Sequence, residues 1–415
     1  MTDTLRDVVV VGGGIVGICT ALSLLESGRA VTLIDKGEPG QATSFGNAGT
    51  ISPWSIVPQS MPGIWRDIPG MLMRPNGAAG VSARHALGYL PWLWRFLQAG
   101  RFDRVHEISK AMHFLCDDSV ALYRAHLAGT GAEHLVRDSM YVHVFRNAAD
   151  ASVDSLGNRM RAAQGAEIER IDAAELRRLE PALSPNLGAA ILIHGQARAM
   201  APGRIGEVLT EKIKRLAGVV MRAEVSSVRP RAGGGWHIAT SAGGIEATQV
   251  VLSAGVWSQK LLKGLGIHVP LAAERGYHIS LPTAEVELNN SVMDADNHIV
   301  ANAMEPGLRF AGIAEFAGVD TPPNPRRIRA LMRCADQLIP GLDFDGREEW
   351  MGIRPSFPDS LPLIEELKGH SDLFAAFGHS HYGLMMAPKT GRLVADLVNR
   401  NRVNTDLSAY SAKRF

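Results

Sequence analysis

The residues with the most specific chemical implication lie near the N-terminus, in the run Gly12-Gly13-Gly14-Ile15-Val16-Gly17. This run follows the apolar segment Val8–Val11 and precedes a helical pattern that continues to Gly28. A second apolar run over 30–34 then ends at Asp35. Strand, GxGxxG turn, helix, strand and acid within about 30 residues predict a dinucleotide-binding site.

Each residue of this motif has a separate expected role. Gly12 permits a tight turn, Gly14 lets the backbone approach a pyrophosphate, and Gly17 lets the helix pack on the strand. The helix N-terminus offers N–H groups and the positive end of its dipole to phosphates. Asp35 is placed to accept hydrogen bonds from ribose hydroxyls, which disfavours NADP. The motif leaves NAD and FAD open, and a glycine turn without a ligand is the structural alternative.

Two arginines could bind a carboxylate, because a planar guanidinium matches its two oxygens. Arg354 lies in the run Gly-Ile-Arg-Pro, and Arg275 follows Glu274. A structural role at a strand end is the alternative for Arg354. A salt bridge to Glu274 or another acid is the alternative for Arg275.

The composition and the cysteines exclude several other classes of protein. The chain has 415 residues, of which 46% are hydrophobic and 20% charged, as in globular proteins. A net charge of +1 gives no field that would attract nucleic acid. Three scattered cysteines predict neither a disulfide framework nor a zinc site, and indicate a reducing, cytoplasmic compartment. The histidines are also scattered, so no metal site is predicted.

The hydrophobic pattern predicts the elements that must position these residues. The uncharged segment 8–25 is long enough for a membrane span, but its valines and glycines favour a strand, a turn and a helix. The segment 85–97, HALGYLPWLWRFL, is expected to form a helix packed into the core; the alternative is a membrane-surface or partner-binding segment. Further helices are predicted at 105–128, 172–180, 202–216, 326–338 and 383–397. Strands are predicted at 139–146, within 219–252 and 269–316, and at 373–377.

Three segments resemble one known family. The run TSFGNAGTISP at 43–53 resembles the loop after the second strand of D-amino acid dehydrogenases, members of the D-amino acid oxidase superfamily of FAD enzymes. The turn at 253–258 is similar to one that returns the chain to the cofactor in that superfamily. The closing block, GIRPSFPDSLPLI and FGHSHYGLMMAPKTGRLVADL, resembles glycine oxidase and the D-amino acid dehydrogenases.

The resemblance implies FAD as the cofactor. It is expected to be noncovalent, because no cysteine lies near Gly352, where some flavin amine oxidases attach it. The implied FAD contacts are Gly12, Gly14, Ile15, Val16, Gly17, Asp35, Lys36, Thr43, Ser44, Asn47, Ala48, Gly49, Val225, Ala254, Gly255, Trp257, Gly352, Arg354, Gly378, His379, Gly383 and Leu384.

The resemblance also implies an activity, the oxidative deamination of a D-amino acid by hydride transfer from Cα to flavin N5. Electrons would pass to a quinone or carrier, because the 43–53 loop is similar to that of the dehydrogenases. The run Ser-His-Tyr-Gly-Leu at 380–384 departs from the small apolar residues expected there, which opens the site to D-proline or a hydroxylated D-proline. The implied catalytic or substrate-contacting residues are Arg354, Arg275, Tyr277, His298, His379 and Tyr382.

The expected architecture is a Rossmann-like α/β FAD-binding domain with a parallel sheet, joined to an α+β substrate domain with an antiparallel sheet. The FAD domain is predicted at 1–85, 187–268 and 349–415, and the substrate domain at 86–186 and 269–348. An oxygen-using glycine or sarcosine oxidase and a noncatalytic flavin-binding subunit remain as alternatives. The expected location is cytoplasmic or peripheral on the inner face of the cytoplasmic membrane. The sequence indicates no particular oligomeric state.

Overall fold

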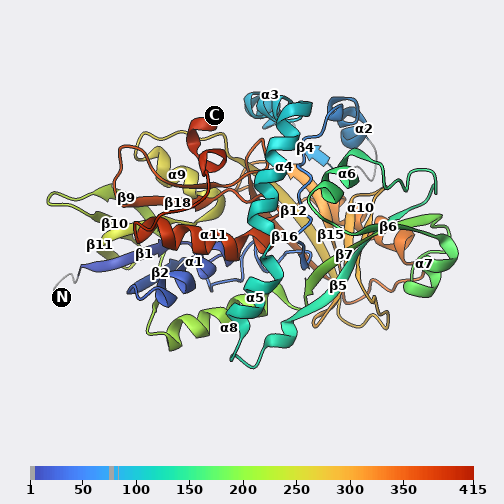
Figure 1. Cartoon of the computed structure of the whole chain (residues 1–415), viewed down its shortest axis with the longest axis horizontal. Coiled ribbons are helices and arrows are strands. Elements are labelled where there is room, and N and C mark those ends of the chain that lie inside the picture. Colours follow the sequence, from blue (N-terminus) through green and yellow to red (C-terminus); the bar gives the residue numbers. More distant parts are fainter. Residues whose placement is uncertain (1–4, 74–78, 83) are drawn as a thin grey trace.

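The computed structural model describes residues 5–73, 79–82 and 84–415, and arranges them as two neighbouring sheets covered by helices (Figure 1). The first sheet has the order β17-β18-β11-β1-β2-β8, and β10 and β9 extend it beside β11. Its strands are β1 (Arg6–Val11), β2 (Val31–Asp35), β8 (Val219–Arg222), β9 (Val225–Pro230), β10 (Trp236–Thr240), β11 (Gly243–Leu252), β17 (Leu363–Glu366) and β18 (Leu373–Phe377).

The central strand β1 runs parallel to both β2 and β11. Its valines alternate between two cores: Val8 and Val10 contribute to one hydrophobic cluster, and Val9 and Val11 to the cluster on the other face. Burial on both faces explains why the strand reads as a continuous apolar run. The predicted strand, turn and helix at 8–25 are therefore confirmed.

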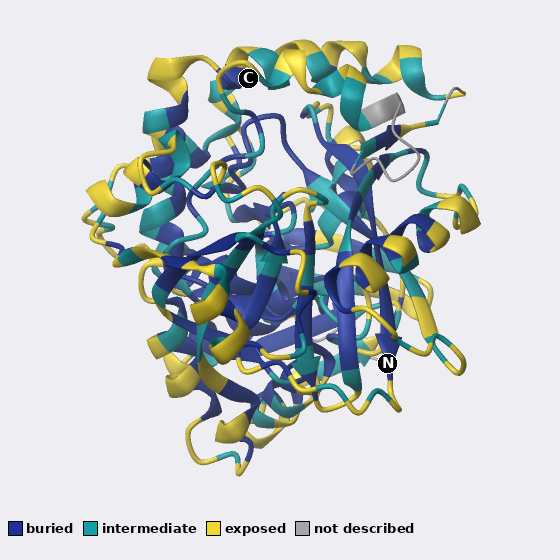
Figure 2. Cartoon of the chain, turned by 90° about the vertical axis from the view of Figure 1, so that its right-hand side faces the viewer, coloured by how far each residue is buried: buried dark blue, intermediate teal, exposed yellow. Residues whose placement is uncertain are grey.

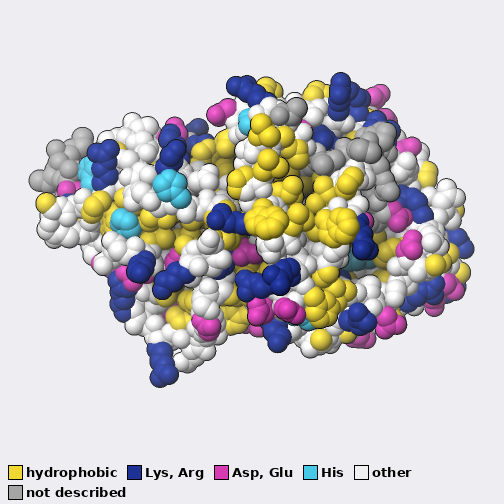
Figure 3. Space-filling view, turned by 90° about the horizontal axis from the view of Figure 1, so that it is seen from above, with side chains coloured by type: hydrophobic (Ala, Val, Ile, Leu, Met, Phe, Trp, Pro, Cys, Tyr) yellow, Lys and Arg dark blue, Asp and Glu magenta, His cyan; other side chains and the backbone are white. Residues whose placement is uncertain are grey.

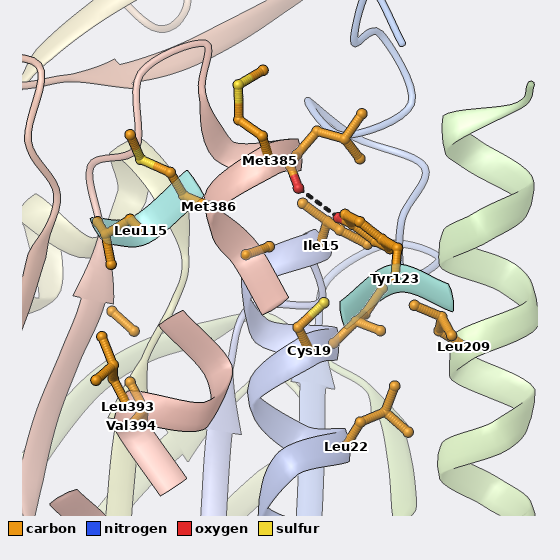
Figure 4. Packing of buried hydrophobic residues seen from close by; sticks show 14 of the residues in the cluster. Ile15, Cys19, Leu22, Leu115, Tyr123, Leu209, Met385, Met386, Leu393 and Val394 are labelled. Carbon is orange, nitrogen blue, oxygen red and sulfur yellow. Dashed lines mark hydrogen bonds between the residues drawn. The ribbon is translucent and has the colours of Figure 1, made fainter. Parts of the chain in front are cut away.

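One face of the first sheet is covered by α1 (Ile15–Glu26), α8 (Pro202–Arg215), α11 (Gly383–Val398), α4 (Phe102–Cys116) and α5 (Ser119–Leu127). Figure 4 shows how these helices share one core, in which Cys19 is fully buried beside Tyr123. The Tyr123 hydroxyl donates a hydrogen bond of 2.7 Å to the Leu384 carbonyl oxygen. Cys19 is thus a core residue.

The second sheet has the order β16-β12-β15-β14-β13-β5-β7-β3, with β4 beside β15 and β6 beside β7. It is mostly antiparallel and packs on α10 (Pro325–Leu338), whose N-cap is Asn324. Its strands are β3 (Thr50–Ile51), β4 (Ala79–Val81), β5 (Val136–Phe145), β6 (Ile168–Asp172), β7 (Ala189–Ala199), β12 (Ala272–Leu281), β13 (Ser291–Asp294), β14 (Ile299–Met304), β15 (Gly307–Phe316) and β16 (Glu348–Ser356).

The remaining helices are short and mostly peripheral. Asp172 caps α7 through the reciprocal pair of hydrogen bonds with Glu175, at the start of the helix predicted at 172–180. These remaining helices are α2 (Ile68–Met73), α3 (Leu90–Ala99), α6 (Leu156–Ala163), α7 (Ala173–Leu179) and α9 (Ser258–Lys263). The 3-10 turns are η1 (Ile64–Arg66), η2 (Ala86–Tyr89), η3 (Glu133–Leu135), η4 (Gly255–Trp257), η5 (Ser408–Tyr410) and η6 (Ala412–Arg414).

The two sheets divide the chain differently from the predicted domain boundaries. Strands β7 and β16 belong to the second sheet, although 187–268 and 349–415 were expected in the FAD domain. Conversely, α4 and α5 pack in the core of the first sheet, although 86–186 was expected in the substrate domain. Figure 2 shows a continuous buried interior that runs through both sheets.

The segment 85–97 forms a helix, as predicted, but it does not pack into the core as expected. In α3 only Trp92 and Ala99 are buried. Leu87, Leu90 and Trp94 are 82%, 54% and 65% exposed. The helix lies over the cavity described below with one face and presents an apolar face outward, so core burial was the wrong interpretation.

Candidate active site

A cavity of about 990 Å³ is lined by residues from both sheets. One end is formed by the glycine turn after β1 and by the ends of β2 and β11. The other end is formed by β12, β16, the loop 54–59 and the start of α11. The helix α3 covers part of it with Trp92, Leu93 and Phe96.

The glycine turn has the geometry that the motif predicted. Gly12 adopts φ +109°, and a Cβ there would lie 2.4 Å from the Ser253 carbonyl oxygen. A Cβ on Gly17 would lie 1.9 Å from the Gly12 carbonyl oxygen, so α1 packs directly on the turn. A Cβ on Gly14 would meet only the Ser44 hydroxyl, at 3.6 Å, and Gly14 lines the cavity. The backbone at Gly14 is therefore open to a ligand at the start of a helix.

Asp35, the acidic residue that ends β2, lies against this turn. The Asp35 carboxylate accepts hydrogen bonds from the backbone N–H groups of Gly13, at 2.6 Å, and Gly37, at 2.8 Å. Lys36 places its ammonium 3.9 Å from the centre of the Trp257 ring. Asp35, Lys36 and Trp257 all line the cavity, so the ribose and base of a dinucleotide have polar and aromatic neighbours there.

Most of the predicted cofactor residues lie around this one cavity. Gly17 and Gly49 are the exceptions, because each packs against backbone or a methionine rather than lining the cavity. The lining includes Gly12, Gly14, Ile15, Val16, Asp35, Lys36, Thr43, Ser44, Asn47, Ala48, Val225, Ala254, Gly255, Trp257, Gly352, Arg354, Gly378, His379, Gly383 and Leu384.

Arg354 lies at the other end, in an ion pair that the sequence did not indicate. It is the cross-strand neighbour of Glu274, and its Nη1 donates to the Glu274 Oε1 at 2.8 Å. Glu274 is fully buried and also accepts from the Ser356 hydroxyl at 2.6 Å. Burial alone would raise the pKa of Glu274, but the Arg354 charge and the Ser356 hydrogen bond hold it below its usual range. The pair is therefore ionised.

Glycine at 276 lets the Arg354 guanidinium lie across β12. A Cβ there would lie 2.4 Å from the Arg354 Nη2. The Arg354 side chain keeps 21% of its surface exposed and lines the cavity, whereas its partner Glu274 keeps none. One nitrogen of the guanidinium is thus fixed by Glu274, and the other nitrogens remain accessible to a ligand in the cavity.

Two histidines and a tyrosine complete this end. Gln59 donates from its amide nitrogen both to Glu274 and to the His381 Nδ1, each at 3.2 Å. The His379 Nε2 lies 3.0 Å from the Thr390 hydroxyl, and the Tyr382 hydroxyl donates to the Val57 carbonyl oxygen at 2.9 Å. Burial lowers the pKa of His379 to about 3 and that of His381 to about 4, so both are neutral at neutral pH.

Arg275 and Tyr277 lie outside this cavity lining, which corrects their predicted contact with substrate. Successive residues of a strand face opposite sides, so Glu274 faces Arg354 while Arg275 faces away. Arg275 is fully buried and pairs with Glu315 at 3.2 Å, and the Tyr277 hydroxyl donates to the same carboxylate at 2.5 Å. The salt-bridge alternative for Arg275 is confirmed, with Glu315 as the acid. Strand alternation was the signal that could have separated the two arginines.

His298 does line the cavity, beside Met293 and Val300. Its backbone adopts φ +54°, and burial lowers the pKa of its imidazole. The sequence missed other lining residues, because they come from distant elements: Gln59, Tyr141, His143, Arg161, Glu274 and Trp350. His381, in the 380–384 run that the sequence singled out, also lines the cavity. Trp350 stacks on His278 with ring centres 4.9 Å apart.

The residues present fit FAD. The open backbone at Gly14, the strand-end acid and the length of the cavity suit a dinucleotide. A Cβ on Gly46 would lie 1.9 Å from the Trp350 ring, so the 43–49 loop packs closely along the cavity. Cys19, Cys116 and Cys334 are all buried elsewhere, in α1, α4 and α10.

Comparison with known proteins agrees with this geometry. The family model described as FAD dependent oxidoreductase matches residues 7–397. A D-amino-acid oxidase from Bradyrhizobium diazoefficiens is 34% identical over 99% of both chains. A D-amino acid dehydrogenase from Neisseria gonorrhoeae is 27% identical over 94% of this chain and 95% of its own. The crystal structure of glycine oxidase from Geobacillus kaustophilus superposes with a TM-score of 0.76 at 22% identity, over 99% of this chain and all of the other.

Proposed function

The chain belongs to the family of FAD-dependent oxidoreductases and is an amino acid oxidoreductase, and we propose that it oxidises a D-amino acid by transfer of a hydride from Cα to the flavin. The product is the imino acid, which water hydrolyses to an oxo acid. The electrons pass to a quinone or another carrier.

The observation that carries this proposal is the position of Arg354. Its guanidinium lines the cavity beside the predicted flavin contacts His379 and Gly352, with one nitrogen anchored on Glu274. An arginine held in this way offers its remaining N–H groups to the substrate carboxylate as a planar fork. Binding the carboxylate there orients Cα towards the cofactor end of the cavity.

The surrounding residues support this role by fixing Arg354 and by keeping the site dry. The Glu274 carboxylate is held by Ser356 and Gln59 as well as by Arg354, so the ion pair has little freedom to rotate. Neutral His379 and His381 add no charge to this end of the cavity. Trp92, Leu93 and Phe96 of α3 cover the cavity with apolar surface that excludes water.

Anaerobic mixing tests the proposal directly. The flavin absorbance of the purified holoenzyme should bleach with a set of D-amino acids, including D-proline and hydroxy-D-proline, and not with their L-enantiomers. Acid should release free FAD from the polypeptide. Bleaching by L-amino acids alone would overturn the proposed preference for D-amino acids. No bleaching by any amine would favour a noncatalytic flavin-binding subunit.

The identity of the electron acceptor needs its own measurement. The resemblance of the 43–53 loop to dehydrogenases favours a quinone, whereas the 34% identical relative is named a D-amino-acid oxidase. We expect a soluble quinone or dye to reoxidise the reduced flavin faster than oxygen does. Stoichiometric peroxide at the full turnover rate would instead establish an oxidase.

A peripheral membrane contact is consistent with a quinone acceptor. None of the helices in the described ranges combines the length and the apolar composition that a bilayer crossing requires. An apolar face formed by Trp65, Leu87, Leu90, Trp94 and Phe102 lies around α3 (Figure 3). Exposed Arg66, Arg95 and Arg101 adjoin Trp65, Trp94 and Phe102 in the sequence, which suits an anionic lipid surface. Leu87→Ser/Trp94→Ser should lose co-sedimentation with anionic vesicles, and no co-sedimentation of the wild type would refute the contact.

A further inference from the structure

The charges around the cavity fall into two groups. One group surrounds the nucleotide end and consists of Asp35, Lys36, Glu224 and Lys260. At the substrate end, the described lining carries three charged side chains, Arg161, Glu274 and Arg354. Burial lowers the pKa of His143, His379 and His381 to about 3 or 4, so these neighbours are neutral at neutral pH.

Arg161 differs from Arg354 in having no counterion. Glu274 compensates Arg354, with the two charged atoms 2.8 Å apart. The Arg161 Nε donates to the Trp54 carbonyl oxygen at 3.1 Å, and its Nη1 donates to the Asn158 amide oxygen at 2.9 Å. Both partners are neutral, and in the described part of the chain no carboxylate pairs with Arg161. The substrate end therefore carries one net positive charge.

Arg161 and the Arg354–Glu274 pair line the same cavity and are both linked to the loop 54–59. The loop 54–59 connects them: Trp54 accepts from Arg161, Val57 accepts from Tyr382, and Gln59 donates to Glu274. Burial raises the pKa of Tyr382, Glu274 raises it further and Arg161 lowers it, so the phenol is within electrostatic reach of both. Both guanidinium groups therefore belong to residues that line one cavity and share one supporting loop.

We propose that Arg161 determines substrate specificity by binding a second carboxylate, so that the site prefers an amino acid with an acidic side chain. This inference rests on the proposed function, in which Arg354 binds the α-carboxylate. The side-chain carboxylate of a dicarboxylic amino acid supplies one further negative charge, which compensates the charge of Arg161. An apolar side chain would leave a desolvated guanidinium uncompensated, and burying a charge without a partner is costly.

The first experiment compares acidic substrates with their amides. Wild-type kcat/KM for D-glutamate or D-aspartate should exceed that for D-glutamine or D-asparagine by about tenfold to a hundredfold, the range expected for one hydrogen-bonded charge. Arg161→Gln should abolish this preference by lowering kcat/KM for the acidic substrates, while kcat/KM for D-alanine should not fall. Arg159→Gln, an exposed arginine on the same helix, is the matched control and should behave as wild type.

Two outcomes would overturn the inference. If Arg161→Gln slows D-alanine as much as D-glutamate, Arg161 binds the α-carboxylate instead. If neither substrate changes, Arg161 binds no substrate group. Arg161→Lys keeps the charge and should keep part of the preference, which separates charge from folding if the Gln variant loses flavin or thermal stability.

A binding experiment separates this inference from the proposed function. Succinate should perturb the flavin spectrum of the wild-type holoenzyme at a Kd about tenfold or more below that of butyrate, and Arg161→Gln should remove the difference. If no amino acid bleaches the flavin, the proposed function fails, and succinate still tests the charge of the cavity. Equal affinity for succinate and butyrate in the wild type would refute the second carboxylate site.

Discussion

The two ends of the cavity are built from different parts of the chain. At the nucleotide end the backbone forms the surface: the Gly12 turn, the start of α1 and the strand-end Asp35 lie within one short segment. At the substrate end side chains form the surface. They come from β12, β16, α6, the loop 54–59 and the start of α11, and a buried ion pair joins them.

This difference predicts how each end responds to substitution. Because the nucleotide end is backbone packed against backbone, a side chain added at its closest contact disturbs the fold itself. Because the substrate end depends on individual side chains, substitutions there should change chemistry while the fold persists. The exception is the Glu274–Arg354 pair. Because the Glu274 charge is buried, removal of its partner Arg354 should also lower stability.

Two glycine substitutions provide the strongest test of how the nucleotide end responds to an added side chain. Gly17→Val should prevent accumulation of folded, yellow protein, because even its Cβ would lie 1.9 Å from the Gly12 carbonyl oxygen. Gly14→Val should abolish FAD binding but leave a folded apoprotein, since the space beside Gly14 is the cavity. Flavin absorbance and circular dichroism measure the two effects. Full flavin occupancy in either variant would refute the assigned turn.

Arg354 should show the largest effect at the substrate end. Arg354→Met removes two hydrogen bonds to the substrate carboxylate, each worth about 1.5–3 kcal/mol, and should lower kcat/KM about a hundredfold to ten-thousandfold. It also leaves Glu274 buried without its partner, which costs about 3–5 kcal/mol of stability. Arg354→Lys should recover only part of the activity.

A double variant separates these two effects. In Arg354→Met/Glu274→Gln the orphaned charge is gone, so Tm should rise towards the wild-type value while activity stays low. Recovery of activity in the double variant would show that Arg354 acts only through Glu274. Near-normal turnover by Arg354→Met would remove the main support for a carboxylate anchor.

The sequence predicted the nucleotide end better than the substrate end, because the residues that specify the nucleotide end lie close together in the sequence. GxGxxG, the following helix and Asp35 are fixed by spacing along a single βαβ unit, and β1, α1 and β2 form close to the predicted bounds. The 373–377 strand and the helix after Gly383 also match, because their apolar patterns are long and regular. Each of these elements is determined by neighbours in the sequence.

The substrate end depends on register between distant strands. Glu274 meets Arg354 because β12 and β16 pair antiparallel at that position, and Arg161 reaches the cavity from α6. A sequence does not specify which distant strands pair, so the identity of the Arg354 partner was not predictable. The face of Arg275 was predictable, because alternation alone places it opposite to Glu274. The helix at 85–97 was expected in the core because its residues are apolar. These residues instead cover the cavity and an outer surface.

The smallest expected effect concerns the pH dependence of stability at the substrate end. His379 is 3% exposed, and burial lowers its pKa to about 3 from its ordinary value of about 6.5. Between these values the unfolded chain binds a proton that the folded protein does not, so stability falls as pH decreases through this window. From pH 6.5 to 5 this group should cost about 2 kcal/mol, at about 1.4 kcal/mol per pH unit.

His379→Gln should therefore flatten the decrease in unfolding free energy between pH 7 and 5 by about 1–2 kcal/mol, measured by urea denaturation. Thr390→Val is the matched control, because Thr390 forms the side-chain hydrogen bond to His379. It should lower stability by a similar amount at every pH, since the titrating imidazole remains. Parallel curves for His379→Gln and the wild type would show that His379 binds its proton at the same pH in the folded protein as in the unfolded chain. Burial would then not keep His379 neutral as the pH falls, and a second uncompensated cation would join Arg161 at the substrate end under acidic conditions.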